Sequence, residues 1–140
     1  MSGGVIWYEL LTDDVAAAAA FYARVIGWRA VDSGQPGMDY RYFSIAGAMV
    51  GGLMALPAAA RAGGAKPAWF PYLHVRDPEA CAAAVAADGG RVFMPPMDIA
   101  GVGRFAMLAD PQGAAFYAMS PSGEGESRAF SPDSVGHGGW

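Results

Sequence analysis

The sequence predicts an α+β protein made of two consecutive βαβββ units. The first observation is an internal repeat, because a shift of 63 residues (73 − 10) aligns Leu10 with Leu73 and Asp14 with Asp77. The second is that each copy begins with a β-rich run followed at once by an alanine-rich helical segment. The third is composition: 140 residues, 54% of them hydrophobic and 16% charged, suffice for one packed domain and argue against global disorder.

The first copy opens with a strand expected over residues 5–11. Asp13 or Asp14 can cap the helix that follows, whose apolar residues recur at spacings of three and four from Val15 to Val25. Short strands are expected over 28–31, 40–45 and 48–56, with Gly51-Gly52 marking a bulge or bend in the last of them.

The second copy opens with a strand expected over residues 69–75. Asp77-Pro78-Glu79 is a strong helix start, with a capping carboxylate, a proline at the first helical position and an acid in the first turn. Gly89-Gly90 ends this helix. Strands are expected over 91–94, 104–109 and 114–119, and Asp110-Pro111-Gln112-Gly113 predicts a type I turn between the last two.

Charge and cysteine content exclude several classes of protein. The net charge is −4, with nine Lys and Arg against thirteen Asp and Glu, which argues against nucleic acid and anionic membranes as partners. A single cysteine excludes a disulfide framework and a cysteine-based zinc site. No run of 18 apolar residues predicts a membrane span, and the first residues do not read as a signal peptide, so we expect a cytoplasmic protein.

We expect a single domain over residues 1–121, with repeats at about 4–57 and 67–121. Residues 122–140 are rich in Gly, Ser and Pro and predict a flexible tail.

Several motifs together carry a resemblance to a known family. They are the run from Trp7 to Val15 (Trp-Tyr-Glu-Leu-Leu-Thr-Asp-Asp-Val), Phe21-Tyr22, Gly27-Trp28, and the Ala-Asp-Pro-Gln-Gly sequence over 109–113. Over about residues 5–121 the chain resembles the vicinal oxygen chelate superfamily, which includes glyoxalase I, extradiol dioxygenases and the fosfomycin and bleomycin resistance proteins. The resemblance implies two units packed edge to edge into an open, cleft-containing half-barrel. It also implies a homodimer, because single-domain members usually dimerise, whereas other relatives carry two such domains.

Metal-using members of this superfamily bind the metal through one residue on the first strand and one on the last strand of each unit. Carried onto this chain, those positions are Trp7, Met54, Phe70 and Tyr117. None is a histidine or a carboxylate, so we expect neither a metal nor another cofactor. Three aromatic rings and a methionine instead predict a cleft that binds a small organic molecule.

Strand alternation adds candidate polar groups to this cleft. Glu9 shares a face with Trp7, and Tyr72 and His74 share one with Phe70. Glu9 is a candidate general base or ligand anchor, or else it forms an ion pair with an arginine. His74 is a candidate acid or base, or else a structural residue at the end of a strand.

Arg41 and Arg104 are equivalent by the repeat. They are expected either to clamp an anionic ligand or to pair with nearby acids.

Three functional interpretations remain open at this stage, besides a purely structural or subunit role in a larger assembly. The first is a metal-independent protein that binds a small organic molecule without catalysis. The second is a metal-free enzyme in which Glu9 works with Tyr72, His74 or Tyr117 as acid–base groups. The third is a metal-dependent glyoxalase or dioxygenase type of enzyme, which would require that the ligand positions have been misread.

Overall fold

The computed structural model describes residues 3–123 and residue 129. This part of the chain divides into two compact units. We call residues 7–69 the N-terminal unit, to which residue 129 is also assigned, and residues 3–6 with 70–123 the C-terminal unit. The predicted tail falls mostly outside the described residues, so the domain limits remain predictions.

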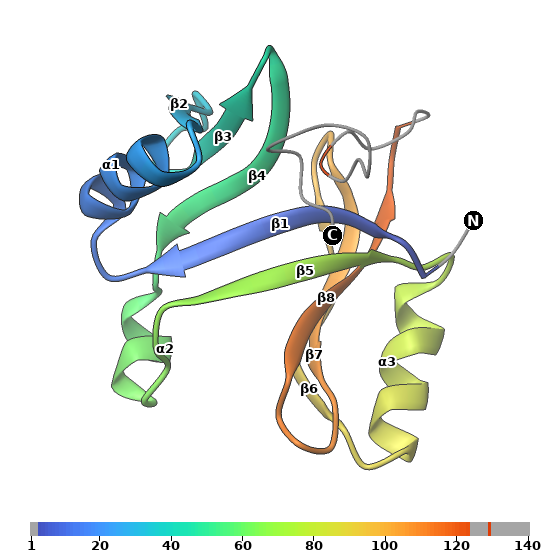
Figure 1. Cartoon of the computed structure of the whole chain (residues 1–140). Coiled ribbons are helices and arrows are strands. Elements are labelled where there is room, and N and C mark those ends of the chain that lie inside the picture. Colours follow the sequence, from blue (N-terminus) through green and yellow to red (C-terminus); the bar gives the residue numbers. More distant parts are fainter. Residues whose placement is uncertain (1–2, 124–128, 130–140) are drawn as a thin grey trace. The chain divides into compact units, whose positions relative to one another are not determined.

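The N-terminal unit has the predicted order of strand, helix and three strands. It contains most of β1 (Val5–Thr12), then α1 (Val15–Val25), β2 (Arg29–Asp32), β3 (Arg41–Ile45) and β4 (Ala48–Ala55). A short helix that the sequence did not suggest, α2 (Ala58–Ala62), follows. The strand order is β2-β3-β4-β1, with β4 parallel to β1 and antiparallel to β3 (Figure 1).

Helix α1 forms where the capping pattern predicts it. The Asp14 carboxylate accepts the backbone N–H of Ala17 at 2.9 Å. At the other end Gly27 has a φ of +83°, a conformation that costs glycine little, and its N–H bonds to the carbonyl of Tyr22. The helix covers one sheet face through a core that contains Leu10, Val15, Phe43, Val50 and Leu53, with Tyr22, Trp28 and Trp69 packed around it.

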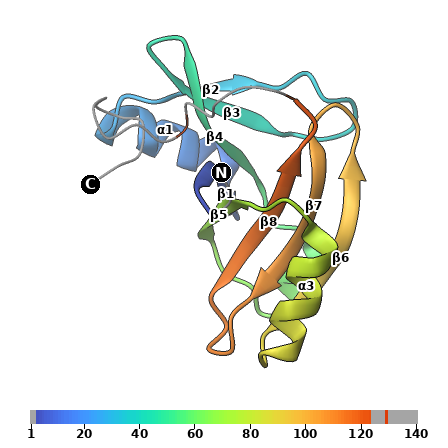
Figure 2. The same ribbon diagram turned by 90° about the vertical axis from the view of Figure 1, so that its right-hand side faces the viewer.

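The C-terminal unit repeats this plan. It contains β5 (Ala68–His74, from Phe70 onward), α3 (Pro78–Ala87), β6 (Arg91–Ile99), β7 (Gly103–Ala109) and β8 (Ala115–Pro121). The strand order is β5-β8-β7-β6, and α3 runs along one side of these strands (Figure 2). Its N-cap matches that of α1, since the Asp77 carboxylate accepts the N–H of Ala80 at 2.9 Å. The two matching caps confirm the duplicated βαβββ pattern at this point of the repeat.

Small residues let α3 lie close to its sheet. The buried cluster there consists of Ala82, Ala106, Leu108 and Ala118. Strand β6 is longer than predicted, because it continues through Pro95-Pro96 to Ile99 with two irregularities in its pairing. As an edge strand it tolerates these prolines, which cannot donate to a ladder.

The two copies differ most in their last hairpins. In the N-terminal unit Ala46-Gly47 alone connects Ile45 with Ala48, and both residues have positive φ, as a type I′ turn requires. In the C-terminal unit the turn occupies residues 110–114, where the Asp110 carboxylate accepts the N–H of Gln112 and of Ala114. Strand pairing makes Tyr42 and Gly52 the counterparts of Met107 and Tyr117, so the shift is 65 residues in the last two strands, and the two extra residues of the C-terminal unit lie before β7. The predicted bulge lies beside Gly51, where Val50 is the extra residue of β4.

No helix in residues 3–123 is long and apolar enough to cross a membrane.

Candidate functional site

The sheet of the N-terminal unit has one apolar face under α1 and one aromatic face. Register places Glu9 opposite Gly52, and Gly52 opposite Tyr42, so these three residues share the face away from α1. Alternation along the chain adds further members to that face. We call this set the aromatic face; it consists of Trp7, Glu9, Tyr40, Tyr42, Gly52 and Met54.

A directed chain of hydrogen bonds crosses the aromatic face. The indole Nε1–H of Trp7 donates to the Tyr40 hydroxyl at 3.2 Å, and that hydroxyl donates to Glu9 Oε2 at 3.0 Å. Glu9 is only 4% exposed, so its carboxylate needs such donors to compensate for the water that it has lost.

Gly52 makes room for this chain. A Cβ built on Gly52 would lie 2.6 Å from Tyr40 Cζ, with the hydroxyl closer still, and 3.2 Å from Trp7 Nε1. No real side chain tolerates such contacts, so the Tyr40 phenol lies over Gly52 only because that residue is glycine. The backbone thus approaches the ring closely, which is a recurrent use of glycine within strands.

The surroundings keep the Tyr40 hydroxyl protonated. Burial is the main cause that raises the pKa of Tyr40 far above its usual value, and the negative charge of Glu9 raises it further. The hydrogen bond from Trp7 acts in the opposite direction without cancelling these effects. Tyr40 therefore acts as a donor toward Glu9 at neutral pH.

Aromatic rings surround this polar chain. Trp7 and Tyr42 meet edge to face at 6.0 Å, and so do Tyr40 and Tyr42 at 5.6 Å. Trp7, Tyr40, Tyr42 and Met54 are all half-buried. A carboxylate among half-buried rings offers both apolar contact area and one strong acceptor of hydrogen bonds.

The C-terminal unit carries a second aromatic cluster on the sheet face away from α3. Tyr72 stacks on Tyr117 with centroids 4.3 Å apart, and Phe70 and Phe105 also contact the ring of Tyr117. The register of His74 with Met119 places His74 on the same face. Four of the sequence-predicted candidates, Phe70, Tyr72, His74 and Tyr117, thus lie on one face of one unit, whereas Trp7, Glu9 and Met54 lie on one face of the other.

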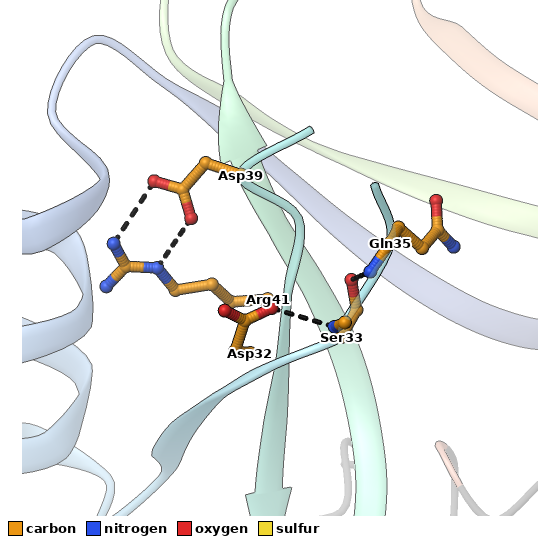
Figure 3. Close-up of polar contacts among 6 residues, drawn as sticks. Asp32, Ser33, Gln35, Asp39 and Arg41 are labelled. Atoms are coloured by element: carbon orange, nitrogen blue, oxygen red, sulfur yellow. Dashed lines mark hydrogen bonds and ion pairs between the residues drawn. The ribbon is translucent and has the colours of Figure 1, made fainter. Parts of the chain in front are cut away.

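The two arginines lie on the helix-bearing faces instead. Arg41 is opposite Leu53 and two residues before the buried Phe43, and its guanidinium makes a two-point ion pair with Asp39 (Figure 3). Arg104 bonds to Glu79 of α3 and to Asp98 of β6. Both arginines therefore pair with nearby acids, which is one of the two expected alternatives. Neither lies on the sheet face that carries the candidate aromatic residues of its own unit.

The residues at the superfamily's metal positions do not suit a metal ion. In the parallel strand pairs, Glu9 is opposite Gly52 and Tyr72 is opposite Tyr117. By strand pairing the counterpart of Tyr117 is Gly52, two residues before the Met54 that the 63-residue shift suggested. Neither residue offers a metal ligand, and residues 3–123 contain no group of three or more His, Cys, Asp or Glu side chains that could hold an ion.

Sequence reasoning missed Tyr40, Tyr42 and the close packing of the Tyr40 ring over Gly52. A signal existed, since Tyr40 and Tyr42 are two residues apart at the start of a predicted strand and so share a face. What the sequence did not contain was the register, which brings Tyr40 across β4 to Glu9.

Comparisons with known proteins agree with this architecture. A model of the glyoxalase/bleomycin resistance protein/dioxygenase superfamily matches residues 4–117. A putative glyoxylase of Mycobacterium tuberculosis, CFP32, is 43% identical over 122 residues, which cover 86% of this chain and 45% of that protein. The anthracycline biosynthesis protein DnrV of Streptomyces peucetius is 37% identical over 125 residues, covering 81% of this chain and 46% of its own. The chain thus spans less than half the length of these relatives.

Solved structures show the same fold at low sequence identity. A methylmalonyl-CoA epimerase from Mycobacterium tuberculosis has a TM-score of 0.60 at 16% identity, covering 86% of this chain and 89% of that one. A Mn(II)-bound glyoxalase from Novosphingobium aromaticivorans has a TM-score of 0.61 at 22% identity, covering 93% of this chain and 42% of its own. These likenesses confirm the expected fold class.

Proposed function

Because this chain belongs to the glyoxalase/bleomycin resistance protein/dioxygenase superfamily, we propose that it binds a small organic molecule on the aromatic face around Glu9. Binding is independent of metal in this proposal, since the superfamily's metal positions carry Trp7, Gly52 or Met54, Phe70 and Tyr117. The observation that carries it is the buried Glu9 carboxylate, held by Tyr40 and Trp7 among half-buried rings.

The chemistry of this face suits a ligand with a ring. The faces and edges of the rings provide apolar contact area for a ligand, and a single buried polar group fixes the ligand's orientation. This is the usual composition of a small-molecule site. The names of the relatives are compatible with this proposal, since one is an anthracycline biosynthesis protein and another a putative glyoxylase. We also propose that the chain forms a homodimer.

A thermal-shift screen of organic compounds tests the proposal. A ligand at 100 times its dissociation constant should stabilise the folded protein by about 2.7 kcal/mol. Trp7→Leu should weaken such ligands at least tenfold, whereas Tyr8→Phe, a change on the opposite sheet face, should leave them within twofold. Binding should survive dialysis against EDTA. A screen without stabilising ligands, or ligands that ignore Trp7→Leu or need a metal, would refute the proposal.

A second candidate function is metal-free acid–base catalysis, which the hydrogen bond from Tyr40 to the buried Glu9 favours. In this version Glu9 is the base, and its partner is Tyr40 rather than Tyr72, His74 or Tyr117, which belong to the other unit. Glu9→Gln separates the two candidates. It should abolish turnover of any ligand that is a substrate, and it should only weaken binding if the protein is not an enzyme.

A further inference from the structure

We infer that two copies of this chain associate through the outer edge of strand β6, around a two-fold axis that passes between Pro95 and Pro96. This inference rests on the proposed homodimer and names its contact surface. It follows from where exposed apolar side chains gather, from the chemistry of an edge strand, and from the order of residues along β6.

Exposed apolar side chains gather along β6 and the turn that follows it. Single exposed hydrophobic residues are normal on a protein surface, but a contiguous patch marks a contact site. In the described part of the chain, five of the eleven large hydrophobic side chains that are more than a third exposed lie within residues 92–102. We call these five the β6 edge patch; it consists of Val92, Phe93, Met97, Ile99 and Val102.

The patch lies on a strand whose outer side is open. β6 ends the order β5-β8-β7-β6, and no other strand of residues 3–123 pairs with its outer side (Figure 2). Register places Val92 opposite Leu108, on the α3 face, and Met97 opposite Phe105, on the other face. Exposed side chains therefore lie on both faces of the strand, so the patch follows the edge of the sheet rather than one face.

The composition of β6 opposes the addition of a further strand by hydrogen bonds. Pro95 and Pro96 have no N–H to donate, and two irregularities interrupt the pairing with β7. Prolines and bulges at an edge prevent open-ended strand addition, which leads to aggregation. What remains for a partner is side-chain packing, and a two-fold axis closes such a contact after one copy is added.

The order of residues along β6 is nearly the same in both directions. Residues 94–97 read Met-Pro-Pro-Met, and Val92 and Ile99 stand at equal distances from the centre of this run. In a two-fold contact, the residue that one copy presents to its partner meets the same pair in reverse. An antiparallel partner turned about this centre therefore brings Met94 to the partner's Met97 and Val92 to the partner's Ile99.

The charges at the two ends of β6 are complementary in this arrangement. Arg91 precedes the patch, Asp98 lies near its other end, and both are exposed. The antiparallel arrangement brings Arg91 to the end where the partner's Asp98 lies, and it keeps the two Arg91 side chains apart. Within residues 3–123 no ion pair involves Arg91, whereas Asp98 also pairs with Arg104. Opposite charges at the rim of an apolar contact favour this orientation over others.

Sedimentation equilibrium over a range of protein concentrations tests this surface. Phe93→Asp places a charge inside the proposed contact and should weaken dimerisation at least a hundredfold. Phe21→Asp is the matched control, because Phe21 is 49% exposed on α1 and Phe93 is 54% exposed on β6. The control should leave the dimer dissociation constant within threefold. Circular dichroism should show that both variants stay folded, since neither side chain is buried.

Methionine methyl signals in ¹³C NMR give a second measurement that needs no disruptive variant. Met97 and Met49 are both 47% exposed, and Met38 is 48% exposed. Dilution from dimer to monomer should shift the signal of Met97 and leave those of Met38 and Met49 in place. Each signal is assigned through the corresponding leucine variant.

The possible failures are distinguishable. A monomer at every concentration would overturn both the homodimer and this surface. A dimer that Phe93→Asp leaves intact, that Phe21→Asp breaks, or whose dilution leaves Met97 unchanged would overturn the surface alone. The ligand proposal is tested separately by the thermal-shift screen, and neither outcome changes it.

Discussion

Replacing Gly52 by alanine is the sharpest structural test of the site. The new Cβ would lie 2.6 Å from Tyr40 Cζ, so the Tyr40 ring cannot keep its present position over residue 52, where it donates to Glu9. The ring must leave, which loses a hydrogen bond to a charged group (about 1.5–3 kcal/mol) and one between neutral groups (about 1 kcal/mol). Alanine returns about 0.4–1 kcal/mol by restricting the unfolded chain. The expected net loss is about 2–3 kcal/mol.

Urea unfolding followed by tryptophan fluorescence measures this loss, and the midpoint should fall by about 1–2 M. Gly4→Ala is the matched control, because a Cβ at Gly4 meets nothing within 4 Å, and it should cost less than about 0.5 kcal/mol. In a Tyr40→Ala background the clash is gone, so Gly52→Ala should cost little there. The account would be refuted if Gly52→Ala lowered the free energy of unfolding equally in both backgrounds, or by no more than Gly4→Ala does. The Tyr40 ring would then not depend on glycine at position 52.

Three further predictions concern other parts of the structure. Burial and the charge of Glu9 raise the pKa of Tyr40, so above pH 10 the folded protein keeps this proton while the unfolded chain loses it. The free energy of unfolding that this group contributes is therefore intact below pH 10 and falls above it. Tyr40→Phe should flatten that fall when unfolding is measured from pH 8 to 11. Asp14→Ala and Asp77→Ala should each cost about 1 kcal/mol in urea unfolding, and the asparagine variants should cost much less, since asparagine also caps. Arg41→Ala and Arg104→Ala should change the affinity for any ligand of the aromatic face less than twofold in thermal-shift titrations, and a tenfold loss would restore the idea of an arginine clamp.

The sequence was most informative about elements whose signals are local. Both N-caps, the turn at residues 110–113 and the βαβββ order depend on residues within a few positions of each other, so pattern and chemistry suffice. The continuation of β6 through Pro95-Pro96 was missed because proline signals the end of a strand unless the strand is at an edge. The last-strand register was missed because the C-terminal unit has two extra residues before β7, which a constant shift of 63 residues cannot represent.

The site depends on contacts between residues far apart in sequence. The sequence singled out Glu9 as a candidate site residue, and the structure buries its side chain, but the expected partners were an arginine or groups of the second copy. The bond that Tyr40 donates spans 31 residues and two intervening strand pairings, and only the register of β1 with β4 and of β4 with β3 brings it about. Until these pairings are known, Gly52 reads as a bend rather than as the place where a ring lies.

The four residues Asp39-Tyr40-Arg41-Tyr42 show how the alternation of side chains along the chain decides which of them lie beside Glu9. Charges and rings alternate, so both tyrosines lie on the side of Glu9, whereas Asp39 and Arg41 lie on the other side and neutralise each other. A shift of one residue would exchange the sets, bringing the guanidinium to the carboxylate and moving both rings away. The same alternation therefore puts the tyrosines on the aromatic face and keeps Arg41 off it. An account of the ligand that needed Arg41 beside Glu9 would have to break the register that holds Tyr40 over Gly52.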